Sequence, residues 1–190
     1  MHPLKYLLPV VLACAGWHHA GAQHTALPAK KVVKHIEMKN TVEHSFGNDI
    51  LMSFKKSDAG AYQLLYPSNE EYLALLQLML QYKVEGLTQE KIDEMIEHRR
   101  RDAAAVYAAE YREFRRQADS LHIDWNAVLY EKFDYIAAYP ENFPVKYLNG
   151  DIWFSSGKRH FVLEGIEAVK IKPGYRLQAI KAIRSTDNAD

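Results

Sequence analysis

The chain has 190 residues with 24 basic and 24 acidic side chains, 48% hydrophobic residues and one cysteine, Cys14. This length and composition are typical of one globular domain with a sizeable core. A formal net charge of zero supplies no basic surplus for neutralising phosphates, so the sequence argues against a nucleic-acid partner.

The first 22 residues have the organisation of a secretory signal peptide. Lys5 precedes an apolar run over residues 6–15, and Ala20-Gly21-Ala22 forms an A-x-A cleavage site. The run is well short of the roughly 20 residues that a transmembrane helix needs. Cleavage after Ala22 would leave 168 residues with a formal charge of −1 and no cysteine, which excludes disulfides and cysteine-based metal sites from the mature chain. The sequence therefore predicts a periplasmic or secreted protein.

A lipid anchor at Cys14 is the alternative. Val11-Leu12-Ala13-Cys14 resembles a bacterial lipobox, in which the cysteine is acylated. Leu12 is bulky where that motif has a small residue, and an apolar run ending at Cys14 would be short, so the sequence favours the soluble form. The rest of the chain divides into a lead-in over 23–39, one domain over 40–185 and a tail over 186–190. Residues 30–38 form either an edge strand or part of the lead-in.

The first part of the domain has helical periodicity. Ser68 and Glu71 form a capping box, Gly86 provides the exit from that helix, and Thr88 caps the long helix that follows. The predicted helices cover residues 41–56, a short turn over 57–66, and then 68–86 and 88–121.

From Trp125 onward the sequence changes to alternation rich in aromatic and β-branched residues. The predicted strands cover residues 128–139, 145–148, 150–156, 158–171 and 174–184, separated by the turns PENFP, NG, SGK and KPG. Such close turns imply an antiparallel meander, and Gly165 predicts a bulge in the longest strand. Helices followed by strands predict an α+β fold, with N-terminal helices packed on one face of a curved C-terminal antiparallel sheet.

This order of elements, together with the closing GYRLQAIKAIR, resembles the NTF2-like and cystatin-like α+β superfamily, whose members fold N-terminal helices into a strongly bent sheet. The resemblance covers most of residues 41–184. The chain is also similar to small exported bacterial proteins of unassigned function. The helix that begins after Thr88 departs from the superfamily in being longer. Members include isomerases, dehydratases and binding modules, so the resemblance does not by itself select a function.

Motifs for common catalytic sites are missing from the sequence. In GDIWFSSGKR, six residues instead of four separate the glycines, and Arg159 stands where a phosphate-binding loop has Ser or Thr. Without a G-x-S-x-G elbow, Ser155 and Ser156 are predicted to be turn residues. Glu94 and His98 lie one helical turn apart, but no third ligand is specified, so we predict neither a metal site nor a cofactor.

Aromatic residues are frequent in the predicted sheet. A bent sheet can leave a partly apolar mouth that holds a small ligand or peptide, with Tyr135 and Trp153 as the aromatic candidates. Asp134, Asp151 and His160 alternate with the aromatic residues and are the candidate acid–base groups. In the structural alternative, the aromatic residues form the core and cross-strand pairs.

Two charges interrupt the apolar stripe of the long helix. Steps of about 100° from Ile92 place Arg99 and Glu110 in the middle of that stripe. They are about 16 Å apart along the helix, too far to pair with each other, so each needs a partner from another element or an opening to water. In one interpretation Arg99 reaches past the sheet edge to water. In the other, both residues line a cavity and Arg99 anchors an anionic group of a ligand.

The sequence therefore predicts an exported, non-enzymatic binding or interaction module, whose partner is a small molecule or an envelope protein. This prediction rests on the lack of nucleophile, metal and phosphate motifs. The alternative is a small NTF2-like lyase or isomerase, in which Asp134, Asp151 or His160 acts as an acid–base group in the sheet cone. An enclosed pocket with an inward Asp or His would favour the enzyme, and a filled cone would favour the module.

Overall fold

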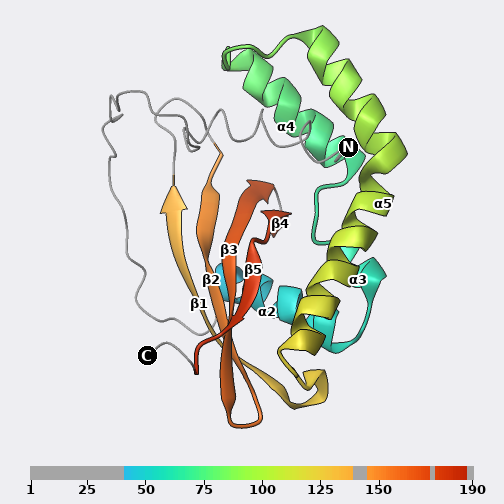
Figure 1. The fold of residues 1–190 in the computed structure, drawn as a ribbon. Coiled ribbons are helices and arrows are strands. Elements are labelled where there is room, and N and C mark those ends of the chain that lie inside the picture. The colour runs from blue at the N-terminus through green and yellow to red at the C-terminus, as the bar shows by residue number, and fades with distance from the viewer. Residues whose placement is uncertain (1–40, 139–144, 172–173, 188–190) are drawn as a thin grey trace, which may run out of the picture.

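A computed structural model of the chain describes residues 41–138, 145–171 and 174–187. The predicted leader with Cys14, the lead-in with its alternative strand over 30–38, and the PENFP turn all lie outside these residues. In the described part of the chain, helices occupy the N-terminal half and a curved antiparallel sheet of five strands follows them (Figure 1). The predicted α+β class is confirmed.

The helices are α2 (Val42–Lys55), α3 (Ala59–Gln63), α4 (Asn69–Gln81) and α5 (Gln89–Ser120). α4 and α5 begin at the predicted polar caps, and α2 begins after Thr41, where the apolar spacing predicted a helix. Thr41, Ser68 and Thr88 each accept a hydrogen bond from a backbone N–H of the first turn, which would otherwise lack a partner inside the helix. Glu71 completes the capping box at Ser68. Within the described residues, no helix has both the length and the apolar character needed to cross a membrane.

The sheet is a meander in the order β1-β2-β3-β4, and β5 also pairs with β3. A short 3-10 turn, η2 (Trp125–Ala127), leads from α5 into the first strand. The strands are β1 (Val128–Ala138), β2 (Tyr147–Ser156), β3 (Arg159–Ile171), β4 (Gly174–Ala179) and β5 (Ala182–Ser185). All strand pairs are antiparallel, as the short predicted turns required.

The predicted turn at Asn149–Gly150 is wrong. β2 runs through both residues, and Gly150 pairs with Tyr135 of β1 and with Ile166 of β3. A Cβ atom on Gly150 would overlap the carbonyl oxygen of Asp134 and lie 2.7 Å from the Cα of Tyr135. The close approach of β1 therefore requires glycine at this position, which explains its presence inside a strand.

β3 changes its pairing partner around Gly165, the predicted bulge. Gly165 has a φ of +63°, and the register between β2 and β3 shifts there. On its N-terminal side β3 pairs with β5, and on its C-terminal side it pairs with β4. The single strand predicted over 174–184 is therefore two strands, divided at residues 180–181.

α2, α3 and the second half of α5 pack on one face of the sheet, which we call the inner face. α2 crosses this face behind the strands in the view of Figure 1, while α5 runs alongside β5. The largest apolar cluster lies between α2, α3, the second half of α5 and the inner face, and it includes Phe54, Phe133, Phe154 and Phe161. A second cluster joins α4 and the first half of α5 to the end of the sheet at Val145 and Val169. α5, with 32 residues, links the two clusters.

Candidate functional site

Arg99 lies on α5 where the two apolar clusters meet. Ile96 belongs to one cluster and Tyr111 to the other. The Arg99 side chain is only 4% exposed, so the guanidinium does not reach past the sheet edge to water. It donates hydrogen bonds to the carbonyl oxygen of Pro67, just before α4, and to the Tyr107 hydroxyl at 2.6 Å. The burial of Arg99, which was predicted from its phase on the helix, is thus confirmed.

The described residues around the Arg99 guanidinium offer it aromatic faces and no carboxylate. Its guanidinium carbon lies 4.6 Å from the ring centre of Tyr72 and 5.6 Å from that of Tyr107, within range of cation–π attraction. Among the described residues, no carboxylate forms an ion pair with it, and its Nε has no hydrogen-bond partner. An uncompensated buried charge is costly, so the two hydrogen bonds and the two rings must offset its loss of hydration.

Three tyrosines connect Arg99 to Glu110. Tyr62 and Tyr66 donate hydrogen bonds to the Glu110 carboxylate at 3.1 and 2.7 Å. The Tyr66 ring stacks on that of Tyr107 with 3.9 Å between ring centres, and Tyr107 in turn accepts from Arg99. Burial raises the pKa of Glu110, and the hydrogen bonds from Tyr66 and Tyr62 oppose that rise only in part. Both charges therefore find partners in the segment around α3 and the start of α4.

This network fastens the segment before α4 to the middle of α5. Each polar contact that we observe in it lies within the fold, which supports a structural role. The ligand-binding role of Arg99 and Glu110 stays a prediction.

The three candidate acid–base residues do not converge. Asp134 lies on the outer face of β1, and 57% of its side chain is exposed. Asp151 accepts a hydrogen bond from the backbone N–H of Gly165 at 2.8 Å, so its carboxylate holds the β3 bulge. His160 is exposed near the start of β3 and lies 2.9 Å from the Glu131 carboxylate. None of the three faces the interior between helices and sheet.

Tyr135 and Trp153 lie on opposite faces of the sheet. Tyr135 packs on the inner side beside Phe133 and His44, with ring centres 5.2 and 6.2 Å away. Trp153 is half-buried on the outer side, where the ammonium group of Lys132 lies 5.2 Å from its ring centre. The two aromatic candidates therefore do not share one site.

A second polar cluster near Tyr135 was missed by sequence reasoning. Glu43, in the first turn of α2, accepts hydrogen bonds from Lys146 and from the Tyr175 hydroxyl, both at 2.8 Å. The side chains of Lys146 and Glu43 are only 12% and 13% exposed. Because Lys146 is 103 positions from Glu43 and Tyr175 is 132 positions from it, no local pattern could have indicated the contact.

The pKa values in this cluster move away from neutrality. Burial alone would raise the pKa of Glu43, but hydrogen bonds from Lys146 and Tyr175 lower it to about 2. Burial opposes the charged form of Lys146, yet its contacts with Glu43 and Tyr175 raise its pKa above the usual range. Burial also raises the pKa of the Tyr175 hydroxyl. Acid–base catalysts work best with pKa values near the operating pH, so this cluster is suited to a fixed ion pair.

Replacing Glu43 with glutamine should lower the free energy of unfolding by roughly 1–2 kcal/mol at neutral pH. The folded-state pKa of Glu43 is depressed, so its stabilising effect is present above its ordinary value of 4.5 and is lost as the pH falls toward about 2. Urea unfolding at neutral and acid pH should therefore show the two proteins converging in acid. Glu113→Gln is the matched control, because the pKa of Glu113 is also lowered to about 2 but its pair with Arg116 is exposed. Equal losses of unfolding free energy in Glu43→Gln and Glu113→Gln would contradict a stabilising role for the buried Glu43–Lys146 pair.

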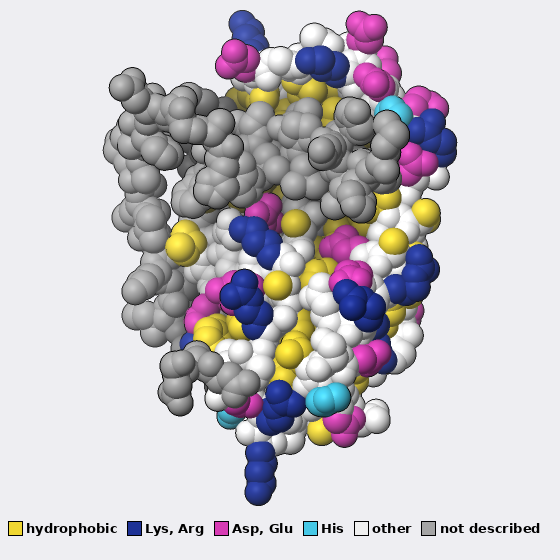
Figure 2. All heavy atoms as spheres, viewed as in Figure 1, with side chains coloured by type: hydrophobic (Ala, Val, Ile, Leu, Met, Phe, Trp, Pro, Cys, Tyr) yellow, Lys and Arg dark blue, Asp and Glu magenta, His cyan; other side chains and the backbone are white. Residues whose placement is uncertain are grey.

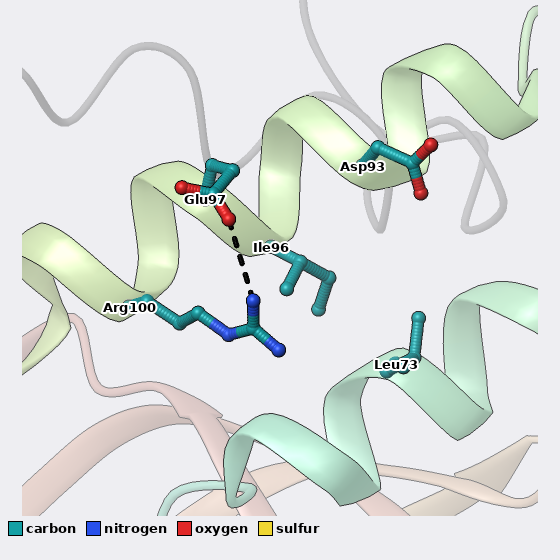
Figure 3. A pocket seen from close by; sticks show the side chains of 5 residues that line it. All are labelled: Leu73, Asp93, Ile96, Glu97 and Arg100. Atoms are coloured by element: carbon teal, nitrogen blue, oxygen red, sulfur yellow. Dashed lines mark hydrogen bonds and ion pairs between the residues drawn. The ribbon is translucent and has the colours of Figure 1, made fainter.

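An open hollow of about 230 Å³ lies between α4 and α5. Figure 3 shows Leu73 of α4 and Ile96 of α5 on either side of this space, with Asp93, Glu97 and Arg100 along α5. Arg100 donates a hydrogen bond to Glu97 at 3.3 Å. Small-molecule pockets usually measure roughly 300–1,000 Å³, so this hollow is better matched to one side chain of a partner.

In the ranges that the structure describes, no group of three His, Cys, Asp or Glu side chains is placed to hold a metal ion. Comparison with family models, curated proteins and solved structures finds no match to this chain. The interpretation of the site therefore rests on its own geometry and chemistry.

Proposed function

We propose that the chain is an exported, non-enzymatic binding or interaction module. The observation that carries this proposal is the aromatic packing between α2 and the sheet. Phe54, Phe154 and Phe161 are fully buried there and pack against one another or through Trp125. A lyase or isomerase of the NTF2-like kind would need an acid–base group facing a cavity at this place.

The three acid–base candidates and the Glu43–Lys146 pair give the enzyme no support either. Asp151 is engaged by the bulge at Gly165, while Asp134 and His160 are exposed. The inner-face pair of Glu43 and Lys146 has pKa values displaced away from neutrality. Export is supported by the leader-like residues before Gln23.

The hollow between α4 and α5 is the surface at which we place recognition. Leu73 and Ile96 supply apolar contact, and Asp93, Glu97 and Arg100 surround it with charge. An apolar centre with a polar rim is the usual composition of a protein–protein contact, in which a few buried side chains contribute most of the binding energy. The partner would thus be a protein that inserts an apolar side chain between the two helices.

Site-specific photocrosslinking in the producing cells tests this function. A photoreactive residue in place of Glu97, on the rim, should give one adduct of defined mass. The same residue in place of Arg112, an exposed position farther along α5, should not give it. Leu73→Asp should abolish the adduct while circular dichroism remains unchanged, because a charge in the hollow opposes an apolar side chain. Identical adducts from both positions, or none from either, would refute recognition at this surface.

A further inference from the structure

β1 is the long edge strand of the described sheet. It has 11 residues and, among the described strands, it pairs with β2 alone. The unpaired edge of a strand presents backbone N–H and C=O groups to which another strand can bond. Leu129 and Ile136 on this strand are 65% and 51% exposed, although both are large apolar side chains. This edge is therefore a candidate for pairing with another chain.

The outer-face positions of β1 that are paired with β2 have a self-complementary order of side chains. Glu131 is the extra residue of a bulge and contacts His160 on the same face, and the paired positions are, in succession, Leu129, Lys132, Asp134 and Ile136. The order is apolar, basic, acidic, apolar, and in reverse it is apolar, acidic, basic, apolar. Two antiparallel copies of β1 would therefore place Leu129 opposite Ile136 and Lys132 opposite Asp134, and each pair would occur twice.

We propose that β1 pairs antiparallel with β1 of a second copy of this chain, joining two sheets into one across a two-fold axis near Phe133. A two-fold interface requires one surface that is complementary to itself, which the order of these side chains provides. Apolar pairs and opposite charges directly across from each other stabilise antiparallel strands. Lys132 and Asp134, which are 2.6 Å apart within one copy, would each gain a second partner of opposite charge.

The overall charge is compatible with self-association. The formal net charge is zero, so two copies approach each other without net repulsion. Figure 2 shows basic and acidic side chains interspersed with apolar ones on the described surface in that view, which is the side turned away from α2. A bulge and a lysine on an edge strand are also devices by which monomeric proteins prevent pairing. Exchanging the charges distinguishes these two roles.

Sedimentation equilibrium of the purified chain should show a dimer whose population increases with protein concentration. Lys132→Asp should raise the dissociation constant roughly tenfold or more, because two attractive pairs become repulsive. Combining Lys132→Asp with Asp134→Lys should return it close to the original value, since the exchanged charges remain complementary. Lys158→Asp, at the exposed β2–β3 turn, makes the same charge change away from the edge and should have little effect. A monomer at every concentration, or no recovery in the double exchange, would overturn the interface.

A disulfide test fixes the register. In the full chain carrying Cys14→Ser, which has no other cysteine, Leu129→Cys combined with Ile136→Cys should form disulfide-linked dimers on mild oxidation. Side chains directly opposite in an antiparallel pair have Cβ atoms roughly 4.5–5.5 Å apart, close enough for a disulfide after small adjustments. Each single variant should stay uncrosslinked, because its cysteine would face an apolar residue of the other copy. Crosslinking of the single variants to the same extent, or monomers throughout because another segment of this chain covers the edge, would reject the proposed pairing.

Discussion

Replacing Gly150 with alanine should destabilise the fold by about 3 kcal/mol or more. A Cβ atom there would overlap the carbonyl oxygen of Asp134 and lie 2.7 Å from the Cα of Tyr135. Both atoms belong to the backbone of β1, so the clash cannot be relieved by rotating a side chain. Because Gly150 lies in β2 between β1 and β3, separating the strands would also disturb the pairing on both sides.

Urea unfolding of Gly150→Ala beside Gly174→Ala measures this effect. Gly174, at the start of β4, has no atom within 4 Å of the position that a Cβ would occupy. Alanine at Gly174 should therefore change the free energy of unfolding by no more than about 0.5 kcal/mol. Similar midpoints for the two variants would show that β1 does not approach Gly150 as closely as the structure indicates.

The same glycine shows what the sequence could not reveal about the fold. Asn-Gly between two segments with strand-like alternation is a strong hairpin signal, and glycine inside a strand where another backbone comes close has the same local appearance. Only the position of β1 distinguishes the two. The starts of α4 and α5 were predictable, because the caps Ser68 and Thr88 act on backbone N–H groups three residues away.

In the candidate site, too, local properties were predictable from the sequence and long-range contacts were not. The burial of Arg99 follows from helical phase, which is a local property of α5. Its partners do not, because Pro67 precedes another helix and becomes a neighbour only when α4 packs on α5. Asp151 looked like a free carboxylate until the register placed it at the N–H of Gly165. A residue's type and spacing thus indicate its burial, whereas its partner depends on how distant elements pack.

Replacing Arg99 with methionine should lower the free energy of unfolding by roughly 2–3 kcal/mol at neutral pH. Methionine keeps much of the length of the side chain and can contact the Tyr72 ring, but it donates no hydrogen bond. The buried carbonyl oxygen of Pro67 would lose the donor that Arg99 provides, and the Tyr107 hydroxyl would lose its 2.6 Å contact. Removing a buried charge recovers part of this cost, so the loss should stay near the lower end of the roughly 3–5 kcal/mol for a broken buried ion pair.

Glu110→Gln is the companion variant, and its effect should have the opposite sign. The folded-state pKa of Glu110 is raised by burial, so ionisation costs folding stability as the pH rises from the ordinary value of 4.5 through the folded-state value. Glutamine keeps an oxygen that accepts from Tyr62 and Tyr66, and it carries no charge. Its stability should therefore match wild type in acid and equal or exceed it at neutral pH. Urea midpoints across pH measure both variants. A larger loss for Arg99→Met would reveal a carboxylate partner of the arginine, whereas two unchanged midpoints would mean that the network does not stabilise the fold.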